Sequence, residues 1–373
     1  MQFHRVRLAS IGYTIPPEVV HSDQIEQQLA PLYKRLELPP GRLELMTGIQ
    51  ERRQWPRGTM PSDRSAESCR HALQAASISG PQIDLLVHGS VCRDYLEPAT
   101  ACRVHHLLGL AADCLTYDVS NACLGLLNGM IQAAAMIDTG QVRSALVVGT
   151  EVSRYLMETT IESLNCDTSL TRQDIKLALA SLTIGSASAA ILLAHEDLAP
   201  DASPLLTATA IANTEHHELC KSTRDVAVGE QMQPMMQTDS ETLMQEGIAT
   251  ATTTFQRFLD QSGWSADQID RSICHQVGGA HRASLLAALQ LDVARDFATF
   301  PWLGNTGSVA LPITLAMAAE QQFLQSGQQL ALMGIGSGIN CLMLGARWAQ
   351  TAVSGNSELI GARSGKTQAT LSS

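Results

Sequence analysis

The sequence has few charged residues and no cluster of positive ones, which excludes several classes of protein. Charged residues make up 16% of the 373 positions, and the formal net charge is -11. Proteins that bind nucleic acids neutralise phosphates with clustered Lys and Arg, and this chain has no basic run. Nucleic acid is therefore not expected as its main partner, and the acidic composition fits a cytoplasmic enzyme better.

The chain also lacks a hydrophobic stretch long enough to cross a membrane. No window holds the roughly 18 uncharged apolar residues that a spanning helix needs. The first residues, MQFHRVRLASIGYTIP, have no apolar core of the kind found in signal peptides. We therefore expect no integral membrane segment and a cytoplasmic location.

Cysteine and histidine are present, but not in the spacing of a metal site. The nine cysteines include no Cys-x-x-Cys pair, and an odd number does not fit a disulfide framework. Adjacent histidines such as His105 and His106 point to different sides of a helix, so they do not indicate a metal site. We expect no bound metal, and most cysteines should be reduced and buried.

Short apolar runs alternate with longer helical patterns, and the order begins again after a polar, acidic stretch near residues 195–203. The alternation predicts an α/β fold. Strands are predicted at 5–12, 83–90, 115–119, 144–151, 186–194, 206–213, 272–277, 329–336 and 340–348. Helices are predicted at 62–79, 100–109, 123–139, 239–262, 279–290 and 307–326.

Two segments of the chain resemble each other. LTYDVSNACLGLLNGMIQAAAM and FATFPWLGNTGSVALPITLAMAA both read as strand, turn and helix, and another strand follows each. This similarity indicates an internal duplication with strands between layers of helices. We expect a first half at residues 1–198 and a second half at 199–349. The Ser, Thr and Gly-rich stretch 350–373 has no apolar periodicity and is predicted to be a disordered tail.

Cys123 lies where a predicted strand gives way to a helix that carries almost no charge. The N–H groups and partial positive charge at the start of that helix would favour the thiolate, which is the nucleophilic form of cysteine. A uniformly apolar helix is buried on all sides and forms a rigid support for a nucleophile. A free cysteine is, however, often only a small buried hydrophobic residue, and this segment alone fits both interpretations.

Candidate partners for Cys123 come from the second half. His275 ends an apolar strand before two glycines, and Asn305 lies in the turn that corresponds to the Cys123 turn. Polar groups at the ends of core strands are typical of functional sites. Alone, His275 also fits a hydrogen-bonded core histidine, and Asn305 a left-handed turn residue. The glycine-rich GIGSGIN suggests that the N–H of Ser337 and that of Cys123 form an oxyanion hole.

In their order, SNACLG, CHQVGGAH, LGNTGS and GIGSG resemble the motifs of thiolase-like condensing enzymes of the 3-oxoacyl-ACP synthase III type. The resemblance runs from about residue 5 to residue 348. It implies a thiolase-like, duplicated five-layer αβαβα sandwich and an obligate homodimer. It also implies a catalytic triad of Cys123, His275 and Asn305.

The run RDYLEPAT, which contains Glu97, is similar to a branch of that family, the OleA-type enzymes, which join two fatty acyl-CoA molecules head to head. The resemblance implies that Glu97 is inserted into the active site of the partner subunit, where it acts as the base. Removing an α-proton from a plain acyl thioester requires a base, whereas decarboxylation generates the carbanion without one. By position alone, Glu97 also fits a surface carboxylate at a helix start.

Together with these residues, the resemblance implies an acyltransferase that carries out a non-decarboxylative Claisen condensation of two fatty acyl-CoA molecules. An acyl-Cys123 intermediate would lead to a 2-alkyl-3-oxo acid for long-chain olefin or related lipid biosynthesis, without a metal or redox cofactor. Acyl carrier protein is a second candidate partner. Arg42, Arg52 and Arg53 are weaker candidates for contacts with CoA phosphates, and solvated surface charge is the favoured interpretation of all three.

Three alternatives remain open. The chain could be a synthase III that condenses an acyl primer with malonyl-ACP, in which case Glu97 is incidental. It could be an acyltransferase that loads Cys123 without forming a carbon–carbon bond. It could also be an inactive structural subunit of a heteromeric synthase, although intact Cys123, His275 and Asn305 argue against that interpretation.

Overall fold

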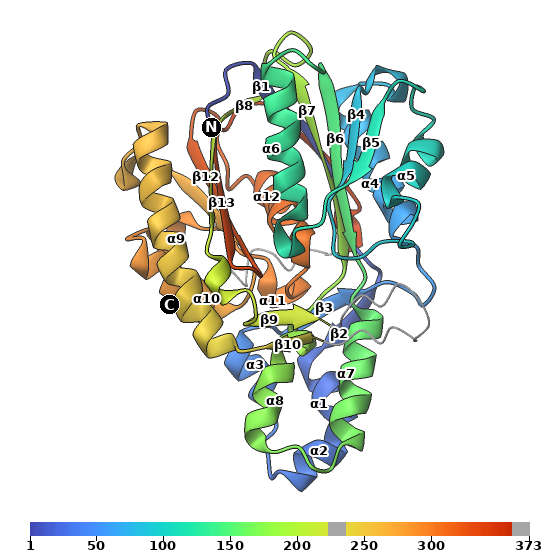
Figure 1. The fold of residues 1–373 in the computed structure, drawn as a ribbon, viewed down its shortest axis with the longest axis vertical. Helices are drawn as coiled ribbons and strands as arrows, with labels where there is room; N and C mark the ends of the chain where they lie inside the picture. Colours follow the sequence, from blue (N-terminus) through green and yellow to red (C-terminus); the bar gives the residue numbers. More distant parts are fainter. Residues whose placement is uncertain (223–235, 360–373) are drawn as a thin grey trace.

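A mixed sheet of ten strands organises the computed structural model, which describes residues 1–222 and 236–359 (Figure 1). The strand order is β11-β12-β13-β8-β1-β7-β6-β4-β5, and β14 pairs with β1. The first half of the chain contributes β1 (Val6–Thr14), β4 (Leu85–His88), β5 (Leu115–Asp118), β6 (Ser144–Glu151) and β7 (Ala187–His195). The second half contributes β8 (Ser203–Ala212), β11 (Arg271–Cys274), β12 (Gln329–Gly336) and β13 (Asn340–Arg347).

Helices form three further layers around the two parts of this sheet. Figure 1 shows α6 and α12 between the two parts, α9 and α10 outside β11–β13, and α4 and α5 outside β4–β7. The bounds are α4 (Pro61–Ala76), α5 (Thr100–Leu108), α6 (Gly125–Asp138), α9 (Ser240–Ser262), α10 (Gly279–Ala288) and α12 (Ala310–Glu320). This arrangement confirms the thiolase-like α/β sandwich of five layers.

The central helix α12 is buried because its sequence is apolar around the whole circumference, whereas α6 is buried except for one stripe that includes the exposed Gln132 and Ala135, so the expectation of burial on all sides is wrong for α6. In α12 every residue from Ala310 to Ala318 is buried, and the charged Glu320 comes at its end. Residues of α6 and α12 share one hydrophobic cluster with the inner faces of β1, β6, β7, β12 and β13. Separate clusters lie under α4 and α5 and under α9 and α10. The boundary at 198/199 between the halves stays a prediction.

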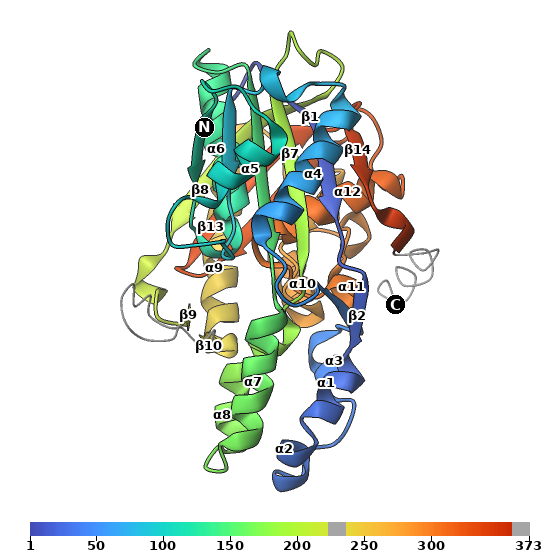
Figure 2. The ribbon, with the colours of Figure 1, turned by 90° about the vertical axis from the view of Figure 1, so that its right-hand side faces the viewer.

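A helical lobe that the sequence patterns did not reveal extends from one end of the layers (Figure 2). It consists of α1 (Ser22–Gln28), α2 (Ala30–Arg35), α3 (Arg42–Thr47), α7 (Arg154–Cys166) and α8 (Arg172–Ala178), with the pair β2 (Glu18–His21) and β3 (Glu51–Gln54) at its base. Its members share a small hydrophobic core. Three further short elements are β9 (Cys220–Ser222), β10 (Met236–Thr238) and α11 (Phe300–Leu303).

The prediction that residues 350–373 form a disordered tail is wrong for the first part of this stretch. Residues Ala352–Gly355 form β14, which pairs in parallel with β1 from Ser10 to Tyr13. β8 pairs with β1 only at Arg7 and Leu8, so β14 satisfies backbone groups that β8 leaves free. Residues 360–373 lie outside the described part of the chain. No described helix is long and apolar enough to span a membrane.

The packing of α4 on β1 predicts a strong effect of a small substitution. A Cβ at Gly12 would lie 2.0 Å from the carbonyl oxygen of Ser68 and 2.4 Å from the nitrogen of Ala72, both backbone atoms of α4. Gly12→Ala should therefore lower the free energy of unfolding by about 3 kcal/mol, the upper end of typical overpacking costs. Thermal and chemical denaturation would measure the loss.

Gly279→Ala is the matched control, because a Cβ there meets its nearest neighbour, a ring carbon of Phe300, only at 3.8 Å. That variant should be as stable as the natural chain or slightly more so, since Ala has less freedom than Gly in the unfolded state. Equal stability of the two variants would contradict the packing argument.

Candidate active site

Cys123 lies in a short 3-10 turn, Ala122–Leu124, between β5 and the central helix α6. Ala122 before it has a left-handed backbone, with φ of 43°. The turn packs against the end of β12 and against the turn Gly307–Val309, so both halves of the chain meet at the cysteine. Gly336 favours this close packing, because a Cβ there would lie 3.1 Å from Cγ of Leu124, the residue after Cys123.

His275 follows directly after β11 and is buried. Its N–H donates to the carbonyl of Met333 in β12 at 2.9 Å. The next side chain, Gln276, donates from Nε2 to the carbonyl of Cys274 and accepts the N–H groups of Thr299 and Phe300 at Oε1. Gln276 thus links the end of the His275 strand to α11, the helix that leads into the Asn305 turn.

Asn305 is held on three sides by backbone hydrogen bonds. Its N–H donates to Thr183, its carbonyl accepts from Gly185, and its Oδ1 accepts the N–H of Gly307 at 3.0 Å. Because Oδ1 accepts this bond, Nδ2 is the donor that the amide presents elsewhere. The left-handed residues of the turn are Gly304 and Gly307, which rules out the interpretation of Asn305 as a left-handed turn residue.

Ser337 lies in the turn between β12 and β13, and a chain of amides connects this turn to the Cys123 turn. Asn340 donates from Nδ2 to the carbonyl of Ser337 at 3.3 Å and to Oδ1 of Asn121 at 3.1 Å. Asn121 in turn donates to Oδ1 of Asn128 in α6 at 2.6 Å. The two segments expected to form the oxyanion hole are therefore cross-linked by hydrogen bonds.

The electrostatics of the free site differ from the expectation of a ready thiolate. Burial, with a further contribution from the charge of Glu151 and then from Cys220, raises the pKa of the Cys123 thiol to about 12. The regular helix α6 begins only at Gly125, so its N-terminus does not offset desolvation. Burial, and secondarily His281, lowers the pKa of His275 to about 3. The resting pair is a neutral thiol and a neutral imidazole, the form of His275 that can accept a proton.

Glu97 is the predicted site residue that this single chain leaves on its surface. It lies in the loop between β4 and α5, where the side chains of Val91, Tyr95 and Leu96 are also exposed, by 58%, 57% and 49%. The other predicted catalytic and oxyanion-hole residues lie on segments that converge, namely those of Cys123, His275, Asn305 and Ser337. Glu97 instead lies exposed on the surface of the protomer.

Two of the three arginines are not the solvated surface charges that we expected. Arg52 is fully buried, donates to Oγ of Ser22 at 3.0 Å, and packs its Cβ 3.1 Å from where a Cβ of Gly304 would be. Burial lowers the pKa of Arg52 to about 10. Arg53 is also buried and donates to the carbonyl of Leu359. Arg52 therefore supports the Asn305 turn, and Arg53 holds the end of the described chain; Arg42 at the start of α3 is half-buried.

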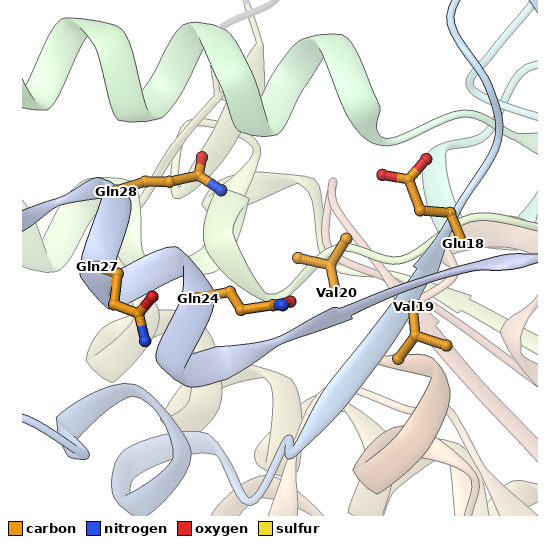
Figure 3. Close-up of a pocket in the computed structure, with 6 residues that line it drawn as sticks. All are labelled: Glu18, Val19, Val20, Gln24, Gln27 and Gln28. Carbon is orange, nitrogen blue, oxygen red and sulfur yellow. The ribbon is translucent and has the colours of Figure 1, made fainter.

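A pocket of about 480 Å³ lies on the helical lobe, between β2 and α1 (Figure 3). It is lined by Glu18, Val19, Val20, Gln24, Gln27 and Gln28. None of the predicted site residues lines this pocket, and its polar glutamines do not suit an acyl chain. Within residues 1–222 and 236–359, no group of three or more His, Cys, Asp or Glu could hold a metal ion.

Sequence reasoning missed several residues that build the site. Gln276, Asn121 and Asn340 were not singled out, although each is adjacent or nearly adjacent to a predicted site residue. Glu151 was also missed, and it is buried at the end of β6. A carboxylate at the end of a mainly apolar strand is the signal that could have found it, because buried acids need dedicated hydrogen-bond donors.

The five-layer sandwich and the meeting of Cys, His and Asn segments from two similar halves define a thiolase-fold condensing enzyme. Sequence comparisons agree with this class. The model of the 3-oxoacyl-ACP synthase III family matches residues 117–205, and that of its C-terminal part matches residues 259–348. The chain is 40% identical over 351 residues to an acyl-CoA:acyl-CoA alkyltransferase of Shewanella oneidensis, covering 93% of this chain and 100% of the relative.

A second acyl-CoA:acyl-CoA alkyltransferase, from Xanthomonas campestris, is 35% identical and also covers 93% of this chain and 100% of the relative. The crystal structure of Xanthomonas campestris OleA with a Cys replaced by Ser, bound to lauric acid and lauroyl-CoA, superimposes with a TM-score of 0.87. That comparison has 35% identity and covers 93% of this chain and 100% of the other. The chain belongs to the 3-oxoacyl-ACP synthase III family, and it is an acyltransferase of the thiolase superfamily.

The neutral resting state predicts how Cys123 responds to pH. Only the thiolate is alkylated, and a pKa near 12 means that its fraction, and hence the rate of modification by iodoacetamide, should rise about tenfold for each unit of pH between 7 and 10. Peptide mapping by mass spectrometry would follow Cys123, with the exposed Cys102 and Cys166 as internal references. A plateau of the Cys123 rate below pH 8 would contradict a buried neutral thiol.

Proposed function

We propose that this chain condenses two fatty acyl-CoA molecules head to head, without decarboxylation, and releases a 2-alkyl-3-oxo acid. The observation that carries the proposal is that the Cys, His and Asn segments meet within the protomer, whereas the carboxylate of Glu97 lies on an exposed loop with apolar side chains. Relatives at 35–40% identity over nearly the whole chain, named acyl-CoA:acyl-CoA alkyltransferases, support the same reaction. The lauroyl-CoA bound to the Xanthomonas protein supports a long-chain acyl-CoA as substrate.

In the first half-reaction the sulfur of Cys123 attacks the thioester carbonyl of one acyl-CoA. Neutral His275 takes the thiol proton as the carbon–sulfur bond forms, which avoids a free thiolate in a dry site. The N–H groups of Cys123 and Ser337 bind the oxyanion. When the tetrahedral intermediate collapses, the bond to CoA breaks and His275 returns the proton to the leaving CoA thiolate.

In the second half-reaction Glu97 of the partner subunit removes an α-proton from a second acyl-CoA. The side chains of His275 and Asn305 polarise the carbonyl of that thioester, and Nδ2 of Asn305 is the donor that its bond from Gly307 leaves for this purpose. The carbanion attacks acyl-Cys123, the carbon–carbon bond forms, and Cys123 leaves as a thiolate that takes up a proton. Water then hydrolyses the CoA thioester, which gives the β-keto acid and free CoA.

A homodimer completes this site. β5 is an edge strand of the sheet. Its first residue, Leu115, is 50% exposed, and its other three residues are half-buried. The apolar loop with Val91, Tyr95 and Leu96 is the other exposed part of this region. Unpaired strand edges and exposed apolar patches favour association, and a second copy would cover both while bringing Glu97 to the other Cys123.

The direct test is incubation of the purified protein with a long-chain acyl-CoA alone, followed by mass spectrometry of protein and products. The natural chain should give an acyl adduct on Cys123 and a β-keto acid or its decarboxylated ketone. Cys123→Ala should give neither, and Glu97→Gln should give the adduct with condensation at least about 100-fold slower, because only the base is lost. An adduct without product until malonyl-ACP is added would favour a decarboxylating synthase instead.

The sharing of Glu97 between subunits predicts which mixed dimers are active. A dimer of one Cys123→Ala and one Glu97→Gln protomer, purified through two different tags, should retain about half of the natural activity, because one of its two sites is intact. A dimer of a natural protomer and a protomer with both changes should be inactive. The reverse result, an inactive first dimer and a half-active second one, would mean that Glu97 acts within its own subunit.

A further inference from the structure

Glu151, the last residue of β6, is a buried carboxylate whose two oxygens accept four hydrogen bonds. Oε1 accepts the N–H of Val91 at 3.1 Å, and the N–H and Oγ–H of Ser308 at 3.2 and 2.6 Å. Oε2 accepts the N–H of Cys92 at 3.2 Å. The side chain is only 4% exposed, so these donors replace water as the groups that stabilise its charge.

The four donors belong to two segments that the proposed reaction uses separately. Val91 and Cys92 form the base of the loop that carries Glu97, and Ser308 follows the turn that holds Asn305. Gly307 lets the carboxylate approach this turn, because a Cβ there would lie 3.1 Å from Cγ, Cδ and Oε1 of Glu151. One buried side chain therefore connects the base of the Glu97 loop to the Asn305 turn.

The loop is further fixed around this contact. The thiol of Cys92 lies between the carbonyl and the N–H of Val152, the residue after Glu151, at 3.7 and 3.3 Å. Ser90 donates to the carbonyl of Thr150 and accepts its N–H, just before Glu151. The residues on both sides of Glu151 thus bind the same loop, which gives the Glu97 segment a rigid base.

We propose that Glu151 is a positioning residue for carbon–carbon bond formation, holding the Glu97 loop and the Asn305 turn of one protomer in a fixed relation. This role rests on the proposed function, because Glu151 would act through two groups of that mechanism, the base Glu97 and the side chain of Asn305 that polarises the second acyl-CoA. Acyl transfer to Cys123 uses neither Glu97 nor the amide of Asn305. Loss of the Glu151 carboxylate should therefore slow condensation much more than acylation.

Glu151→Gln is the variant of choice, because it keeps the shape and the oxygen that accepts from Val91 and Ser308. Its NH₂ group would face the N–H of Cys92, so a donor meets a donor at the loop base. Asp84→Asn is the matched control at the opposite end of β6, where the carboxylate accepts the N–H groups of Arg143 and Ser144 at 2.6 and 3.2 Å. Both variants remove one buried or half-buried acceptor that serves backbone donors.

Acylation and condensation are measured separately, as the rate of acyl-Cys123 formation and the rate of β-keto acid release from a long-chain acyl-CoA. For Glu151→Gln we expect acylation within about threefold of the natural rate and condensation about 10- to 100-fold slower, the cost of misplacing a reacting group by around 1 Å. Asp84→Asn should change the two rates equally or not at all. Denaturation curves identify any variant that fails to fold.

A mixed dimer sharpens this test. If the protomer with Glu151→Gln also carries Cys123→Ala and its partner is natural, the one working site has a natural Asn305 turn and receives Glu97 from the altered loop. Slow condensation in this dimer, relative to a dimer with Cys123→Ala alone, supports positioning of Glu97 through Glu151. Equal loss of acylation and condensation, or no loss of either, would overturn the proposal. Absence of product from the natural protein would instead refute the proposed function itself.

Discussion

The packing of the largely apolar helices α6 and α12 between the two parts of the sheet is the constraint on which the rest of the structure depends. α12 is apolar on all sides and α6 on all but one narrow stripe, so neither could be exposed as a whole, and each begins directly after a turn that carries a proposed site residue. Cys123 precedes α6 by two residues and Asn305 precedes α12 by five. Because the turn Ala122–Leu124 before α6 packs against the turn Gly307–Val309 before α12, filling the core also brings the segments of Cys123 and Asn305 together. The position of the site is thus a consequence of how the core is filled.

Close packing at this end also determines the chemistry of the resting enzyme. Desolvation raises the pKa of Cys123 and lowers the pKa of His275, so both groups are neutral and neither needs a counter-ion. A neutral thiol is poorly nucleophilic, and attack requires the transfer of its proton to the imidazole as the bond to the substrate forms. The hydrogen bonds of Gln276, Asn121 and Asn340 hold the segments that carry His275 and Cys123 without adding a charged group. Reactivity therefore depends on the arrival of an acyl thioester, and not on a standing thiolate.

The layers of the fold could be predicted from the sequence, but the helical lobe and the pKa values of the site could not. Strands such as 144–151 and 329–336 and the helix 239–262 were predicted within one or two residues, because long apolar runs and clear periodicity mark buried elements. The helices α1, α2 and α3 have six or seven residues each, and their apolar face is completed only by α7, about 120 residues later. Likewise, β14 reads as a polar tail because its partner β1 lies at the other end of the chain. The pKa of Cys123 follows from burial by distant segments, which a local motif does not report.

Two carboxylates take part in the proposed mechanism, and their surroundings in the structure differ. Glu151 is close enough to Cys123 for its charge to raise the pKa of the thiol, yet both of its oxygens are occupied by the donors of Val91, Cys92 and Ser308. To accept an α-proton, it would have to release the loop and the turn that it joins, and those buried N–H groups would lose their acceptors. Glu97, in contrast, is exposed in the later part of that same loop, shortly before α5. A base must be able to gain and lose a proton without disturbing the site, and of these two carboxylates only Glu97 is placed to do so. In the proposed mechanism Glu151 therefore holds the base of the loop, and Glu97, which the same loop carries, accepts the proton.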